Sequence, residues 1–135
     1  MVRLPLETLP EVLRRSPYHR LLGFEMVRAL AGEVVIRMPF REDLLAGDDE
    51  FGQYVHGGAI ASLIDTTGDF AVIAAVGYDV PTIDLRVDYL RPATRGALTA
   101  TGRAIKAGRT LALADVEVVG EDGRPVAVGR GAFKT

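Results

Sequence analysis

The hydrophobic pattern of the chain is dominated by one segment, residues 57–76, which is apolar on nearly all sides of a helix. A helix without a polar face is typical of one that surrounding structure buries. A His-Gly-Gly turn opens the segment, and Gly77 is suited to end it. The pattern therefore predicts one long central helix that other elements enclose.

The residues after this segment predict four strands. Between Thr82 and Tyr89, apolar and polar residues alternate as in a half-buried antiparallel strand. Three further strand-like runs follow, at Leu98–Ile105, Thr110–Val119 and Val126–Phe133. The turn between the last two runs contains Asp122-Gly123, which is a strong hairpin signal.

The residues before the helix predict two short helices, two strands and a loop. Helical spacing is present over Leu6–Arg15 and Pro17–Leu22, and strand-like runs cover Phe24–Leu30 and Glu33–Phe40. Residues 41–54 form a polar connection whose length is typical of a functional loop in a compact domain, with disorder as the alternative.

Two strands, one long helix and four more strands describe an α+β fold with antiparallel strands. A helix that is apolar all round needs a sheet curled about it. We therefore expect the hotdog fold, an antiparallel sheet of about six strands wrapped around one long central helix. A single domain over residues 1–135 is expected, with residues 1–20 as its N-terminal helical segment.

The composition mainly excludes certain partners and kinds of site. The formal net charge of −2 gives no general attraction to nucleic acid or to an anionic membrane, so neither is expected as a partner. The chain has no cysteine, which excludes disulfides, thiolate metal sites and a cysteine nucleophile. We find no signal peptide over residues 1–17, and the longest apolar run, residues 70–76, is short for a membrane span. A cytoplasmic location is expected.

The start of the central helix is the main candidate for chemistry. Helix starts leave backbone N–H groups without partners and carry a partial positive charge, which suits a developing oxyanion. Asp65 and Asp69 lie further along the same segment, where a carboxylate can act on water at that place. Imidazole is a common general base, but a structural role at the turn is the preferred interpretation of His56. A metal site needs several ligands, and the only other histidine, His19, lies in a different segment.

Four segments resemble, in order and spacing, the hotdog-fold acyl-CoA thioesterases, with the PaaI (phenylacetic acid degradation) type as the nearest group. They are Leu21–Glu25, Val55–Asp69, Val87–Ala93 and Lys106–Thr110. The resemblance implies a hydrolase that splits an acyl-CoA thioester into a free acid and CoA, with no metal or covalent cofactor. It also implies a homodimer whose sheets join edge to edge, commonly paired into a homotetramer, with sites at the dimer interface.

The resemblance assigns roles to individual residues. Asp65 matches the acidic catalytic residue, as nucleophile or as general base on water. Gly57 matches the glycine whose N–H polarises the thioester carbonyl, with Gly58 beside it at the substrate. His56 matches the histidine that helps to set the turn. Thr82 falls where some members place a hydroxyl that helps to hold the attacking water, supplied by the opposite subunit.

Two positions depart from the pattern of the family. Glu50 stands where relatives often have Asn or Gln near the thioester, so either Gln53 serves instead or a second carboxylate faces the site. Asp69 stands where small or hydroxyl residues are common. We expect Asp69 to reach solvent or to pair with an arginine across an interface. If instead Asp65 and Asp69 were both buried and close, one of them would have a raised pKa.

Four basic residues at strand ends or turns are candidates for the phosphates of CoA, and we expect one or two of them to make contact. They are Arg91, Arg95, Lys106 and Arg109. Two other function classes remain open at this point, since fold alone does not decide function. One is a non-catalytic acyl-CoA-binding module, and the other is a hotdog hydratase or dehydratase. The acyl group itself is either aromatic or a medium-chain fatty acyl.

Overall fold

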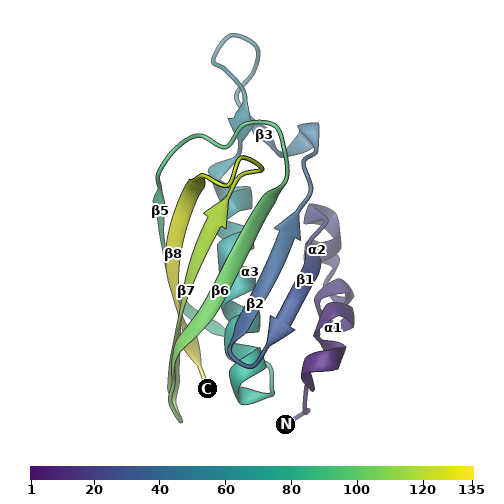
Figure 1. Cartoon of the computed structure of the whole chain (residues 1–135), viewed down its shortest axis with the longest axis vertical. Helices are drawn as coiled ribbons and strands as arrows, with labels where there is room; N and C mark the ends of the chain where they lie inside the picture. The colour runs from purple at the N-terminus through teal and green to yellow at the C-terminus, as the bar shows by residue number, and fades with distance from the viewer.

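The computed structural model describes residues 1–135 as a six-stranded antiparallel sheet around one helix, which confirms the expected hotdog fold (Figure 1). The strand order is β1-β2-β6-β7-β8-β5. The strands of this sheet are β1 (Glu25–Leu30), β2 (Glu33–Met38), β5 (Thr82–Tyr89), β6 (Leu98–Ala107), β7 (Leu111–Val119) and β8 (Pro125–Lys134). The helices are η1 (Leu6–Thr8), α1 (Leu9–Arg15), α2 (Pro17–Leu22), η2 (Glu42–Leu44) and α3 (Gly57–Val76).

Helix α3 has the bounds that its sequence pattern predicts, because both ends carry capping residues. His56 caps its first turn, and Gly77 ends it in the left-handed conformation with φ of +85°. By length and composition α3 also passes as a membrane span, although 67% of its most apolar window is buried inside the fold. The fold thus buries most of the apolar surface of this helix.

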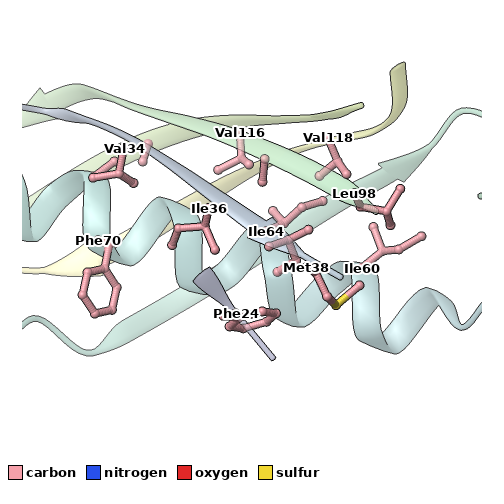
Figure 2. Close-up of a cluster of buried hydrophobic side chains, with 14 of the residues drawn as sticks. Phe24, Val34, Ile36, Met38, Ile60, Ile64, Phe70, Leu98, Val116 and Val118 are labelled. Atoms are coloured by element: carbon pink, nitrogen blue, oxygen red, sulfur yellow. The ribbon is translucent and has the colours of Figure 1, made fainter. Parts of the chain in front are cut away.

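The core lies between α3 and the concave face of the sheet. Figure 2 shows Val34 and Ile36 of β2 and Val116 and Val118 of β7 on the sheet side, facing the α3 side chains. The helix comes very close to β8, where a Cβ added at Gly129 would lie 2.6 Å from Ile64 Cγ2. This packing fixes where each residue of α3 lies along the strands.

The two edges of the sheet differ. Helices α1 and α2 flank the β1 side, with Leu9 and Leu13 fully buried (Figure 1). At the other edge, β5 pairs only with β8 and has no strand on its outer side. The apolar side chains of Ile83 and Tyr89 on β5 are 58% and 52% exposed. An unpaired apolar edge strand favours pairing with another chain.

The polar connection over residues 41–54 is partly ordered by pairing. Strands β3 (Leu45–Ala46) and β4 (Tyr54–Val55) form a short ladder, and the tip between them extends beyond the end of the sheet (Figure 1). The backbone N–H of His56 donates to the carbonyl of Leu44 at 2.8 Å. The base of this loop therefore holds the residue that begins α3.

Candidate active site

The first turn of α3 leaves one N–H group free. The N–H groups of Ala59 and Ile60 donate to the carbonyl of His56 at 3.0 and 3.3 Å. The N–H of Gly58 donates to His56 Nδ1 at 2.8 Å, which requires a ring whose proton is on Nε2. Gly57 N–H makes no hydrogen bond within the chain. The N–H of Gly58 is therefore already bound to the His56 ring, and the contact of Gly58 with substrate stays a prediction.

An apolar groove opens beside Gly57. Its volume is about 430 Å³, within the range of small-molecule sites. The lining residues come from the end of the polar connection, the first turn of α3 and the segment that follows β5. They are Tyr54, Val55, Gly57, Ile60, Tyr89, Leu90, Arg91, Pro92 and Ala93. The free N–H of Gly57 thus lies at a concave surface that suits an apolar chain.

Asp65 lies partly buried in the middle of α3, facing the start of β5. Thr82 Oγ1, on the first residue of β5, donates to Asp65 Oδ1 at 2.8 Å. The two residues belong to one chain, because β5 returns along α3 and places Thr82 beside the middle of the helix. The expectation that Thr82 of the opposite subunit helps to hold the attacking water stays a prediction. The second carboxylate oxygen, Oδ2, makes no hydrogen bond.

Gly57 and Asp65 of one chain do not meet at one point. Eight residues of helix separate them, which is a rise of about 12 Å. Groups that act on one carbonyl must each lie about 3 Å from the reacting atoms. The sequence-based picture of a carboxylate acting at its own helix start is therefore corrected, because each chain holds the two groups at separate places.

Asp69 differs most from expectation. Its Oδ1 atom is fully enclosed without a hydrogen-bond partner, and no arginine pairs with the carboxyl group. Burial raises the pKa of Asp69 to about 8, and the charges of Asp79 and Asp65 add to the shift. The chain alone gives Asp69 no arginine partner, and pairing with an arginine across an interface stays a prediction. A buried carboxyl beside another carboxylate keeps its proton at neutral pH instead.

The four basic residues proposed for the CoA phosphates lie in different parts of the molecule. Arg91 lines the groove, and its Nε atom is enclosed without a partner. Arg95 is engaged elsewhere, with Nη1 2.8 Å from Glu42 Oε1 and Nη2 donating to Gln53 Oε1 at 3.2 Å. Lys106 and Arg109 lie at the β6–β7 turn.

That turn lies near the far end of α3 from Gly57. The evidence is Gly32, whose added Cβ would contact both Ala75, near the end of α3, and Ala104, near the end of β6. Of the four basic residues, only Arg91 therefore lies at the groove of its own chain. Contact of Lys106 or Arg109 with CoA at a site shared between two chains stays a prediction.

The polar loop does not bring Glu50 or Gln53 into the groove. Both are exposed, and neither lines it. The N–H of Glu50 donates to Asp48 Oδ1 at 3.0 Å, which keeps this residue within the loop tip. Their expected position beside the thioester is not found in the chain alone. Sequence reasoning also missed that Tyr54, Tyr89 and Leu90 line the groove, although Tyr89 and Leu90 lie in the Val87–Ala93 segment that resembles the family.

A larger hollow of about 610 Å³ lies on the sheet and is lined mostly by charged side chains. Arg130 binds Asp115 there through two hydrogen bonds of 2.6 and 3.0 Å, which hold the pKa of Asp115 below its usual value. Neither Gly57 nor Asp65 lines this hollow. Arg86 and Asp88 form a second ion pair there, and the hollow does not belong to the candidate site.

Fold and site together define a hotdog-fold protein with an N–H donor at the start of its central helix and a carboxylate in the middle of it. The family model described as "Thioesterase superfamily" matches residues 52–127, which is more than half of the chain. The chain belongs to the thioesterase superfamily. The expected enzyme class is thereby confirmed at the level of the family.

Individual relatives agree with this assignment. A Halobacterium salinarum protein named as a candidate esterase is 43% identical, with 84% of this chain and 80% of the relative covered. The medium/long-chain acyl-CoA thioesterase YigI of Salmonella typhimurium is 31% identical, with 78% of this chain and 77% of the relative covered.

Solved structures show the same fold. A protein from the thioesterase superfamily superposes with a TM-score of 0.90 at 38% identity, covering 96% of this chain and 97% of that one. The PaaI protein of E. coli, from the phenylacetic acid degradation operon, superposes with a TM-score of 0.85 at 26% identity, covering 95% and 90%.

Proposed function

We propose that the protein hydrolyses acyl-CoA thioesters to a free acid and CoA. The observation that carries this proposal is the unpartnered N–H of Gly57 at the start of a buried helix, beside an apolar groove. An N–H in this position is suited to bind the oxygen of a thioester whose acyl chain lies in the groove. The YigI relatives, which are named as acyl-CoA thioesterases, support CoA as the thiol carrier.

In the proposed reaction, Gly57 N–H donates to the carbonyl oxygen of the thioester as this oxygen becomes negative. One such donor contributes about 3 kcal/mol to the stability of the transition state. Asp65 acts on the carbonyl carbon, directly or by removing a proton from a water that attacks it. The C–S bond breaks, and CoA leaves as its thiolate. The scheme uses no metal and no covalent cofactor.

Two chains complete each site in this proposal, because about 12 Å of helix rise separates Gly57 from Asp65 in one chain. Two hydrogen bonds link these residues to opposite ends of the edge strand β5. Asp65 is bound by Thr82 at the beginning of β5, and Gly57 is bound by Tyr89 at its end. If two copies pair along β5 in antiparallel fashion, the beginning of one strand lies beside the end of the other. The carboxylate of one copy then approaches the N–H donor of the next.

The exposed apolar residues of β5 supply the surface for such pairing. Ile83 and Tyr89 are more than half exposed in the single chain, and β5 has no partner on its outer side. We therefore propose a homodimer joined edge to edge through β5, with two equivalent sites. Pairing of two such dimers into a homotetramer is proposed from the resemblance alone.

A medium-chain fatty acyl group is the proposed substrate class, and a hydroxylated or plain phenylacetyl group is the competing one. The groove is lined mostly by apolar residues, as a fatty acyl chain requires. YigI, which is named for medium- and long-chain substrates, supports the first class. Arg91 at the groove is the proposed contact for a CoA phosphate, because its guanidinium lies beside the apolar surface.

Release of free CoA from a panel of acyl-CoA substrates tests this function. The panel runs from acetyl to palmitoyl and includes phenylacetyl. We expect release with each fatty acyl substrate of medium length, and a kcat/KM of at least about 10⁴ M⁻¹s⁻¹ for the best of them. A preference for phenylacetyl would contradict the substrate class and leave the hydrolysis intact. Tight binding with no release on any substrate would favour a non-catalytic acyl-CoA-binding module.

A further inference from the structure

Tyr89, the last residue of β5, contacts the first residue of α3 in two ways. Its Oη donates to the carbonyl oxygen of Gly57 at 2.6 Å. Its ring also lies directly over Gly57, where an added Cβ would be 3.2 Å from both Cζ and Oη of the tyrosine. The side chain is nevertheless 52% exposed and forms part of the groove wall.

The hydrogen bond acts on the residue whose N–H is free. The first turn of a helix has few backbone partners, so its peptide groups are held mainly by caps and side chains. His56 binds Gly58 from one side, and Tyr89 binds the Gly57 carbonyl from the other. Glycine also has more backbone freedom than any other residue. A second anchor at Gly57 therefore restricts the direction in which its N–H points.

We propose that Tyr89 is a positioning residue, whose hydroxyl group fixes Gly57 so that the free N–H points into the groove. This inference rests on the proposed function, in which that N–H binds the thioester oxygen. The anchor comes from the edge strand that we propose pairs with a second copy. Tyr89 thus links the position of β5 to the geometry of the N–H donor.

The variant Tyr89→Phe tests this role, because it removes the hydroxyl group and keeps the ring over Gly57. The matched control is Tyr78→Phe, because Tyr78 lies beyond the other end of α3, does not line the groove, and also donates its hydroxyl proton to a backbone carbonyl, that of Thr135 at 3.4 Å. We expect Tyr89→Phe to lower kcat about tenfold, because the N–H of Gly57 is then less well aligned with the thioester oxygen. KM stays within about twofold, because groove contacts are unchanged. Tyr78→Phe leaves both constants unchanged.

A second measurement does not depend on activity. Backbone ¹⁵N order parameters of the amides of Gly57 and Gly58 are expected to fall in Tyr89→Phe and to stay unchanged in Tyr78→Phe. The positioning role is wrong if Tyr89→Phe keeps both kcat and these order parameters, or if Tyr78→Phe lowers both by as much as Tyr89→Phe does. If the unmodified protein hydrolyses no thioester, the proposed function fails, and the order parameters alone decide whether Tyr89 fixes Gly57.

Discussion

Asp65→Asn is expected to lower kcat by about 10³-fold while the protein still folds and binds CoA ligands. An amide has the size of the carboxyl group, and its oxygen still accepts the hydrogen bond that Thr82 donates to Asp65 at 2.8 Å. It neither takes a proton from water nor attacks a carbonyl carbon. The loss should therefore fall on kcat, with little change in KM for an enzyme whose chemical step is slow.

CoA release under saturating substrate measures this effect, and calorimetric titration with a non-hydrolysable thioether analogue measures binding. Glu117→Gln is the matched control, because Glu117 lies on β7 away from the groove and from β5, is exposed and makes no ion pair. The control should keep full activity. Full activity in Asp65→Asn would show that another group performs the chemistry.

Asp69→Asn is expected to stabilise the fold increasingly as the pH rises. The pKa of Asp69 is raised by burial to about 8, whereas an unfolded aspartate loses its proton near 3.8. Between these values the folded chain binds one more proton than the unfolded chain, so the free energy of unfolding falls as the pH rises. Between pH 5 and pH 8 the titration of Asp69 lowers the free energy of unfolding by about 4 kcal/mol. Asparagine has no proton to lose over this range.

Urea unfolding at pH 5 and pH 8, at one fixed protein concentration, measures this prediction. The difference in unfolding free energy between Asp69→Asn and the unmodified protein should grow by about 4 kcal/mol between these pH values. Glu117→Gln serves again as the control and should show no such growth. If the two pH dependences of Asp69→Asn and the unmodified protein run parallel, Asp69 does not keep its proton in the folded chain.

Much of the fold follows from local patterns. The ends of α3 coincide with prediction because the residues that end it, His56 and Gly77, act on their own neighbours. The strands after it follow from alternation and from turn residues such as Gly123, whose φ is +79°. Two-residue strands, β3 and β4, have no such pattern, since a short ladder within a polar loop depends on contacts across the loop.

The site is less predictable because its geometry depends on distant contacts. The sequence singles out Gly57 and Asp65 by their place on the helix. It does not show that Thr82 reaches Asp65 in the same chain, which depends on how β5 returns along α3. The protonation of Asp69 likewise depends on a residue outside the helix. The charge of Asp79, which follows the end of α3, raises the pKa of Asp69.

To test a site shared between two chains, we require a variant that removes the N–H of Gly57 without disturbing α3. Proline at position 57 is such a variant. Gly57 is the first residue of the helix, where proline is well tolerated. His56 before it is extended, with ψ of 132°, as a residue before proline requires. Gly57→Ala is the matched control, because it adds the same Cβ contact with Tyr89 and keeps the N–H group. We expect a loss of about 10²–10³ in kcat for Gly57→Pro beyond that for Gly57→Ala.

Co-expression of Asp65→Asn with Gly57→Pro tests the shared site most directly. In a mixed dimer, one of the two sites combines an intact Gly57 from one chain with an intact Asp65 from the other. Random pairing of equal amounts should therefore restore activity to about one quarter of that of the unmodified protein, although each variant alone is nearly inactive. A mixture as inactive as its components would contradict a site built from Gly57 of one chain and Asp65 of another.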